Sequence, residues 1–300
     1  MFRSTTIGAL GVVFGLGSVL SQDIIIKNLS DEYSVVQLLF IRSAFALLIL
    51  LLFIPFFVKG NALSTSRLGI QVLRGSLQFC SFVCYYIALK TMPILDLVAI
   101  FFTAPLIAVA LSVPVLKEKV SMSHWCAVGL GFLGSLIMIK PGGNNFEPAI
   151  TLFALGAASL YAGSIVATRL LGKSDQSVTT TLYTCIMYAA LGGLSVIAVE
   201  FIVPLFQPGA IISTYSIWIT PGIEQLGLLA LAGLAVCIAF LLLAYAYTLA
   251  PVSVLVPWEY SALIWGGLFG YIFLEQIPAT TTVLGAMLIV ISGIYIARKS

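Results

Sequence analysis

Charge is scarce in this 300-residue sequence, since only 8% of the residues are Asp, Glu, Lys or Arg, against about 25% in soluble domains. There is a single histidine, and the five cysteines lie in apolar runs without a CxxC pair. A soluble fold of this length needs a charged shell that so few side chains cannot provide. The shortage therefore excludes a soluble enzyme, and the cysteines favour no disulfide scaffold, metal site or cofactor. A net charge of +3 from scattered basic residues argues against a nucleic-acid partner.

The sequence is instead rich in apolar residues, and 61% of its residues are of the types AVILMFWYC. A helix that crosses a bilayer needs about 20 mostly apolar residues. Cutting the chain where charge, proline or glycine interrupts such runs predicts an all-α integral membrane protein with ten transmembrane helices. The predicted spans are 7–27, 35–58, 68–90, 94–116, 122–140, 148–172, 177–203, 225–248, 252–274 and 279–297.

The distribution of basic residues predicts the orientation, because loops on the cytoplasmic side are richer in Lys and Arg. With the N-terminus in the cytoplasm most of the loop cations lie inside, and an even number of crossings puts the C-terminus there too. We therefore expect a multi-pass protein of the inner membrane with both termini cytoplasmic. The inside cations are Arg3, Lys59, Arg67, Lys117, Lys119, Arg169, Lys173, Arg298 and Lys299, and the outside ones are Lys27, Lys90 and Lys140.

The two halves of the chain share motifs. The stretch YYIALKTMP at 85–93 resembles YAYTLAP at 245–251, and LKE at 116–118 resembles FLE at 273–275, at separations of 157 or 158 residues. We therefore predict two repeats of five helices each, covering residues 1–143 and 144–300. Because five is odd, the second repeat is inverted relative to the first, which is the arrangement in which a site forms near the midplane and access alternates.

Short motifs along the whole chain carry a family resemblance. They are LRG at 73–75, the link at 88–93, FFTAPL at 101–106, LKE at 116–118, and the stretch from PWEY to FLE within 257–275. With these motifs the chain resembles the drug/metabolite transporter superfamily, in the branch with two EamA-type repeats, and is most similar to its S-adenosylmethionine, riboflavin and amino-acid transporter groups. The resemblance implies alternating access and leaves the direction of transport open.

Ionisable residues inside apolar spans are the candidate binding groups, because a charge at mid-membrane is costly unless it faces a cavity or a partner. Arg74, Gln78 and Tyr85 form a polar stripe on one face of the third span. A guanidinium offers a rigid pair of donors to a substrate carboxylate. The alternative is that Arg74 reaches the cytoplasmic surface or serves as a structural partner.

Glu259 is the strongest single candidate, since it follows Pro257 in the ninth span. Proline removes a backbone donor and loosens the helix. A carboxylate beside such a break can bind an ammonium or sulfonium group, or carry a coupling proton, or pair structurally with Arg74 or Arg42. Trp258, Tyr260 and Trp265 can add faces for a cation or a flat ring.

Further candidates come from the first, second, fourth and sixth spans. Asp23 and Arg42 both fall toward the outer side, where they either pair as a gate or serve only as a helix cap and a headgroup contact. Thr103 lies in FFTAP, the interrupted counterpart of the ninth span, and its hydroxyl can satisfy a carbonyl that Pro105 leaves free. Tyr161 can line the cavity from the sixth span.

The sequence therefore predicts a secondary transporter that moves a small polar organic metabolite, such as an amino acid or a derivative like S-adenosylmethionine, across the inner membrane. Riboflavin, carboxylates or lipid-like compounds are alternative substrates. An intramembrane enzyme is a remote alternative, because no HExxH, GxSxG or deep aspartate pair occurs. The expected partners are the substrate and the lipid bilayer, with a proton or a counter-substrate left open, and the expected assembly is a monomer or a weak homodimer.

Overall fold

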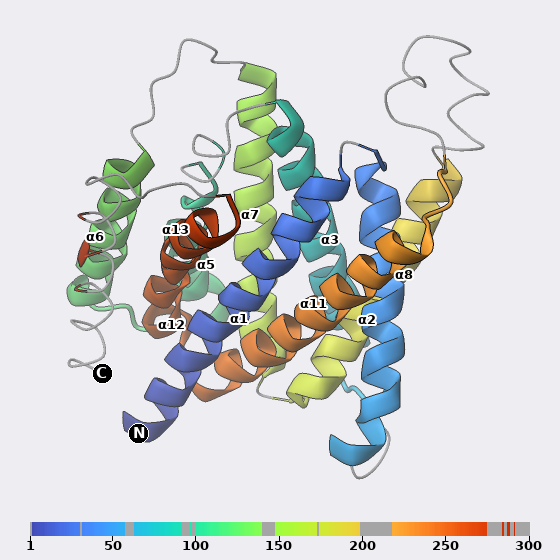
Figure 1. Cartoon of the computed structure of the whole chain (residues 1–300). Helices are drawn as coiled ribbons and strands as arrows, with labels where there is room; N and C mark the ends of the chain where they lie inside the picture. The colour runs from blue at the N-terminus through green and yellow to red at the C-terminus, as the bar shows by residue number, and fades with distance from the viewer. Residues whose placement is uncertain are drawn as a thin grey trace.

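The computed structural model of the protein is a bundle of helices, and the described part of the chain contains no strand (Figure 1). The structure describes residues 2–30, 32–57, 63–91, 97, 100–139, 148–172, 174–198, 218–274, 284, 287, 288 and 291. Helices suit such an apolar sequence, since they satisfy their backbone N–H and C=O groups internally where water is absent. They are α1 (Phe2–Leu29), α2 (Val35–Phe57), α3 (Leu68–Thr91), α5 (Ala104–Leu116), α6 (Met122–Ile139), α7 (Pro148–Leu171), α8 (Ser177–Ile197), α11 (Ile223–Leu249), α12 (Val252–Glu259) and α13 (Ser261–Leu274).

Six stretches of these helices are long and apolar enough to cross a membrane, and all six fall on predicted spans. Helices α3 and α6 match two further predicted spans, and α5 matches the part of the fourth span from residue 104 onward. Most of 279–297 lies outside the described residues. The six stretches are Ser4–Leu29, Val35–Pro55, Ile150–Leu171, Ser177–Ile197, Ile223–Leu249 and Val252–Phe273.

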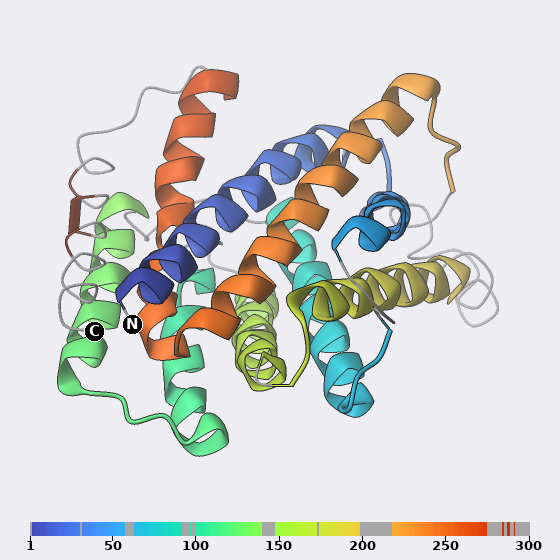
Figure 2. The same ribbon diagram turned by 90° about the horizontal axis from the view of Figure 1, so that it is seen from below.

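Helices from the first half of the chain pack mainly against helices from the second half. The most extensive contacts join α1 to α11 and α3 to α7, and α2 packs on both α8 and α11. Figures 1 and 2 show α1 and α11 running side by side in opposite directions. The interior of the bundle is therefore built at the boundary between the two halves.

The surface of the bundle is apolar and its interior holds polar side chains, which is the reverse of a soluble protein. Large apolar residues that face outward occur along most of the helices, and they suit contact with lipid tails. Examples are Phe14 on α1, Leu52 on α2, Leu152 on α7 and Leu231 on α11, each at least half exposed. The buried polar side chains include Gln22, Arg42, Gln71, Arg74, Gln78, Thr168, Thr180, Thr184 and Glu259.

Two of the predicted spans are interrupted next to proline-containing motifs. In the fourth span a turn at Phe102 and Thr103 precedes α5. In the ninth span Tyr260 separates α12 from α13 and follows Pro257 by three residues. Helix α12 packs directly on α5, so the two interruptions belong to one region of the bundle.

Candidate functional site

Glu259 is a buried carboxylate at the break between α12 and α13. Its side chain is only 4% exposed and accepts a hydrogen bond from the hydroxyl of Tyr247 on α11. The hydroxyl of Tyr161 on α7 lies near the same carboxylate. Within the described residues Glu259 forms no ion pair, so pairing with Arg74 or Arg42 is not what the structure shows. A neutral phenol donor rather than a cation holds the carboxylate, which leaves its charge available for a cation or a proton.

The three aromatic side chains that the sequence placed beside Glu259 have different surroundings. Tyr260 donates to the carbonyl of Val128 at 3.2 Å, and Trp265 donates to the carbonyl of Val13 at 2.8 Å. Both are therefore held by hydrogen bonds to other helices of the bundle. The indole N–H of Trp258 has no acceptor among the described residues, although the atom is buried. Trp258 is thus the one of the three with a donor left for a ligand.

Arg74 is 3% exposed and is anchored between α7 and α8. Its Nε donates to Thr168 Oγ1 at 2.6 Å, and its Nη1 donates to the Thr184 hydroxyl and to the Thr180 carbonyl. Because Thr168 and Thr184 also donate to carbonyls of their own helices, their oxygens are oriented to accept from Arg74. The guanidinium therefore links helices of the second half to α3.

Gln78 and Tyr85 continue the predicted stripe along α3. The backbone carbonyl of Gln78 accepts from the Tyr188 hydroxyl at 3.1 Å, and its side-chain Oε1 is buried without a donor in the described chain. Tyr85 is half-buried, and its ring lies 5.2 Å from that of Phe101, centroid to centroid. Both side chains face the interior of the bundle.

Asp23 and Arg42 are connected through a third residue. Arg42 Nη1 donates to Gln22 Oε1, and Gln22 Nε2 donates to Asp23 Oδ1. The Tyr86 hydroxyl also donates to Asp23 Oδ1. Asp23 and Arg42 thus share a hydrogen-bonded chain rather than a direct ion pair. Sequence analysis missed Gln22 and Tyr86, although each stands next to a predicted site residue in an apolar helix.

A row of aromatic rings joins the surroundings of Glu259 to those of Arg42. It starts at Tyr161, which lies near Glu259, and ends at Phe82, whose ring centroid lies 5.4 Å from the Arg42 guanidinium carbon. Such rings offer apolar surface and π-faces between two charged groups. The aromatic row consists of Tyr161, Phe101, Tyr85, Tyr86 and Phe82, with successive centroids 5.3, 5.2, 5.5 and 6.0 Å apart.

Thr103 lies in the turn that interrupts the fourth predicted span. Its Oγ1 donates to the Ile100 carbonyl at 2.7 Å. The hydroxyl thus satisfies a carbonyl at the break, although Pro105, which has no N–H, would free the carbonyl of Phe101 instead. Thr103 is half-buried.

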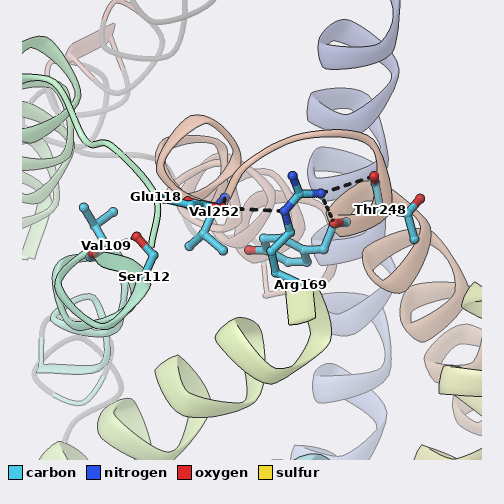
Figure 3. Close-up of polar contacts among 7 residues, drawn as sticks. Val109, Ser112, Glu118, Arg169, Thr248 and Val252 are labelled. Carbon is cyan, nitrogen blue, oxygen red and sulfur yellow. Dashed lines mark hydrogen bonds and ion pairs between the residues drawn. The ribbon is translucent and has the colours of Figure 1, made fainter. Parts of the chain in front are cut away.

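A second polar cluster, not predicted as a site from the sequence, joins the ends of α5, α7 and α11 to the start of α12 (Figure 3). Helix α5 ends at Lys117, whose φ of 56° lies in the left-handed region, and Glu118 follows. Glu118 Oε1 lies 3.5 Å from Arg169 Nε and accepts from the Val252 N–H at 3.4 Å. Arg169 Nη1 donates to the carbonyls of Tyr247 and Thr248, at 2.8 and 3.2 Å. The sequence did offer a signal for Glu118, because it belongs to the motif LKE that returns as FLE in the second half of the chain.

The contact between Glu118 and Arg169 can be measured with a double-mutant cycle. Both side chains are largely buried, with 15% and 13% exposure for Arg169 and Glu118, so we expect Glu118→Gln and Arg169→Gln each to lower the melting temperature. The double variant should be destabilised by about 1 kcal/mol less than the sum of the single variants, because the second substitution no longer breaks an intact contact. Thermal unfolding of the four proteins in detergent measures the cycle, and strictly additive effects would show that the contact contributes nothing.

The part of the chain that the structure describes holds no group of three or more His, Cys, Asp or Glu residues placed to bind a metal ion. The groups that it does hold are suited to binding a ligand. They are a carboxylate at a helix break, buried guanidinium groups and the aromatic row that connects them. Together with the apolar helices, these features define a multi-pass membrane protein with ionisable groups in its interior.

Comparison with known proteins finds similarity to transporters. Residues 6–140 match the model of the EamA-like transporter family. The S-adenosylmethionine uptake transporter of Rickettsia bellii is 25% identical over 294 residues, which cover 98% of this chain and 94% of that protein. The riboflavin transporter of Vibrio cholerae is 26% identical over 86% of this chain and 81% of that protein. The first part of the chain is therefore similar to the EamA-like transporter family, and most of its length is similar to transporters of small molecules.

A solved crystal structure has the same fold. It superimposes with a TM-score of 0.77 at 18% sequence identity and covers 99% of this chain and 98% of its own. At such low identity the match speaks for the fold alone. The arrangement of helices described above is therefore shared along the full length of both chains.

Proposed function

We propose that this protein is a secondary carrier that moves an amino acid, or a derivative such as S-adenosylmethionine, across the inner membrane by alternating access. The observation that carries this proposal is the pair of interrupted helices. Helix α12 packs on α5, and the break after α12 holds the buried carboxylate of Glu259. Interrupted spans in corresponding places of two halves mark the binding site of many transporters.

Two glycines support the inverted repeat on which alternating access depends. A Cβ on Gly75 of α3 would lie 2.6 Å from Met187 of α8, and one on Gly233 of α11 would lie 2.7 Å from the carbonyl of Arg42 on α2. Gly75 and Gly233 stand 158 residues apart, the same separation as the motifs. At each of these glycines the third helix of one half lies against the second helix of the other half. A two-fold relation between residues 1–143 and 144–300 requires this pattern.

The larger packing pattern supports the same relation. If the halves are equivalent, α1 corresponds to α7 and α3 to α11, so the pair α1 with α11 corresponds to α7 with α3. These two pairs have the most extensive contacts in the described bundle. We infer a ten-helix carrier with both termini in the cytoplasm, in which one half rocks against the other around a site near the midplane.

The proposed substrate contacts surround the aromatic row. Glu259 meets a cationic group or a coupling proton, and Trp258 adds its free indole N–H. Asp23 and Arg42 form the second charged group, as a gate or in coupling. The remaining proposed contacts are Arg74, Gln78, Tyr85, Thr103, Tyr161, Tyr260 and Trp265.

Ligand-dependent melting of the purified protein tests this function. The panel contains the common amino acids, S-adenosylmethionine, riboflavin and small dicarboxylates. A ligand that binds only the folded state stabilises it by about 2.7 kcal/mol at 100 times its Kd, so we expect amino acids or S-adenosylmethionine to raise the melting temperature. Uptake of the same compound into proteoliposomes then has to follow. Stabilisation by riboflavin alone would move the substrate to flavin-like rings, and no uptake of any panel compound would contradict the proposal.

A further inference from the structure

Arg42 has an unused edge on its guanidinium group. The side chain is 0% exposed, and its Nη1 donates to Gln22 Oε1. Nε and Nη2 are buried without any acceptor from the described residues. The N–H groups of Nε and Nη2 point in the same direction, and this edge of the guanidinium matches the two oxygens of a carboxylate. A buried donor without an acceptor raises the free energy of the folded state. An acceptor from outside the described chain would remove this cost.

Asp23, which is linked to Arg42 through Gln22, also has an unused oxygen. Both of its hydrogen bonds, from Gln22 and Tyr86, end on Oδ1, so Oδ2 accepts none from the described chain. Asp23 is half-buried, in contrast to Arg42. The side-chain amide of Gln22 lies between the two charged groups and bonds to both. The residue with the free acceptor and the residue with the free pair of donors are therefore linked by a single amide.

We propose that Arg42, Gln22 and Asp23 bind the head group of an α-amino acid, with the carboxylate on the Nε/Nη2 edge of Arg42 and the ammonium on Asp23 Oδ2. In an α-amino acid these two charges are separated by one carbon atom, which suits two opposite charges bridged by one amide. This inference rests on the proposed function and makes Arg42, rather than Arg74, the contact of the carboxylate.

The comparison with Arg74 supports this assignment. Arg74 places its Nε on Thr168 and its Nη1 on Thr180 and Thr184, so a carboxylate would have to displace the Thr168 bond to use the Nε edge. The same edge is vacant on Arg42. A phosphate is a poorer match, because its double charge needs several cations, whereas the Arg42 site holds one cation and one carboxylate.

The rest of the substrate extends along the aromatic row. Phe82, at one end of the row, lies against the Arg42 guanidinium, and Tyr86 bonds to Asp23. Tyr161, at the other end, reaches Glu259. The head-group site therefore selects an α-amino acid, while the aromatic row and Glu259 select its side chain, with preference for a flat or cationic one.

Matched ligands test the head-group site in the wild-type protein before any substitution. Each amino acid that stabilises the protein, and S-adenosylmethionine, is compared with its amide, which lacks the carboxylate, and with its 2-hydroxy analogue, which lacks the ammonium. We expect both analogues to bind at least 10-fold more weakly in thermal titrations. Equal affinity of acid and amide would overturn the assignment of the carboxylate to Arg42.

Two variants then locate each charge. Arg42→Lys keeps a cation opposite Asp23 but loses the paired donors, so the preference for acid over amide should fall at least 10-fold while the preference for amine over hydroxyl remains. Asp23→Asn should do the reverse. Arg74→Lys should weaken acid and amide to the same degree, and Arg67→Gln, on an exposed side chain, should change neither.

The outcomes separate this inference from the proposed function. If acid and amide are both transported and Arg42→Lys keeps the wild-type preference, the head-group site is wrong while the carrier function stands. If Arg74→Lys rather than Arg42→Lys removes the preference, the carboxylate belongs on Arg74. If the protein transports riboflavin and no amino acid or S-adenosylmethionine, the α-amino acid class is wrong. If nothing in the panel is transported, the proposed function fails and the head-group site fails with it.

Discussion

Glu259→Gln is expected to reduce transport at least 100-fold while the protein still folds. The glutamine amide retains the size of the side chain, and its carbonyl can still accept from Tyr247, so the packing around the break persists. What disappears is the negative charge, and with it the contact for a cationic group and the ability to carry a proton. Uptake of the stabilising ligand into proteoliposomes, measured from pH 5 to pH 9, checks the prediction.

The control for this variant is Glu224→Gln, which removes a carboxylate from the exposed first turn of α11. It should leave transport unchanged. Melting temperatures of both variants should stay within a few degrees of the wild type. Normal transport by Glu259→Gln at every pH would remove both the charge-contact role and the proton-carrier role from this residue.

Gly233→Ala is expected to destabilise the protein by about 3 kcal/mol, at the upper end of the cost of overpacking. The new Cβ would lie 2.7 Å from the Arg42 carbonyl and 3.0 Å from the backbone nitrogen of Ala46. Backbone atoms of α2 cannot move aside as the end of a side chain can, so α11 and α2 have to separate. The melting temperature and the yield of monodisperse protein measure the effect.

Gly227→Ala on the same helix provides the matched comparison. A Cβ at Gly227 meets nothing within 4 Å, and alanine favours a helix over glycine by about 1 kcal/mol. This variant should be as stable as the wild type or more so. Equal melting temperatures for the two variants would show that the close approach at Gly233 is unimportant.

Much of the architecture could be predicted from the sequence because lipid imposes simple rules. Apolar runs of sufficient length have to become helices, and all six stretches able to span a membrane coincide with predicted spans. Proline in the FFTAP and PWEY motifs indicated two interrupted helices, and the structure has both breaks. Such features depend on residues that are close together in the chain.

The partners of the buried charges could not be predicted in the same way. Arg42 and Arg74 look alike in the sequence, each a lone arginine in an apolar span, and the sequence favoured Arg74 as the substrate contact. In the structure Arg74 is bonded to threonines of α7 and α8, whereas two donor atoms of Arg42 have no acceptor among the described residues. The difference arises from residues about 20 positions away in one case and about 100 in the other.

The sequence by itself determined that this chain is helical, lies in a membrane, repeats its motifs at half its length and has a carboxylate beside a proline break. Only the tertiary structure decided which buried charges are already satisfied. It also revealed Gln22 as the link between Asp23 and Arg42, and the aromatic row between Arg42 and Glu259. The physical reason is that hydrophobic length acts locally along one helix, whereas the satisfaction of a buried donor depends on which distant helices pack against it.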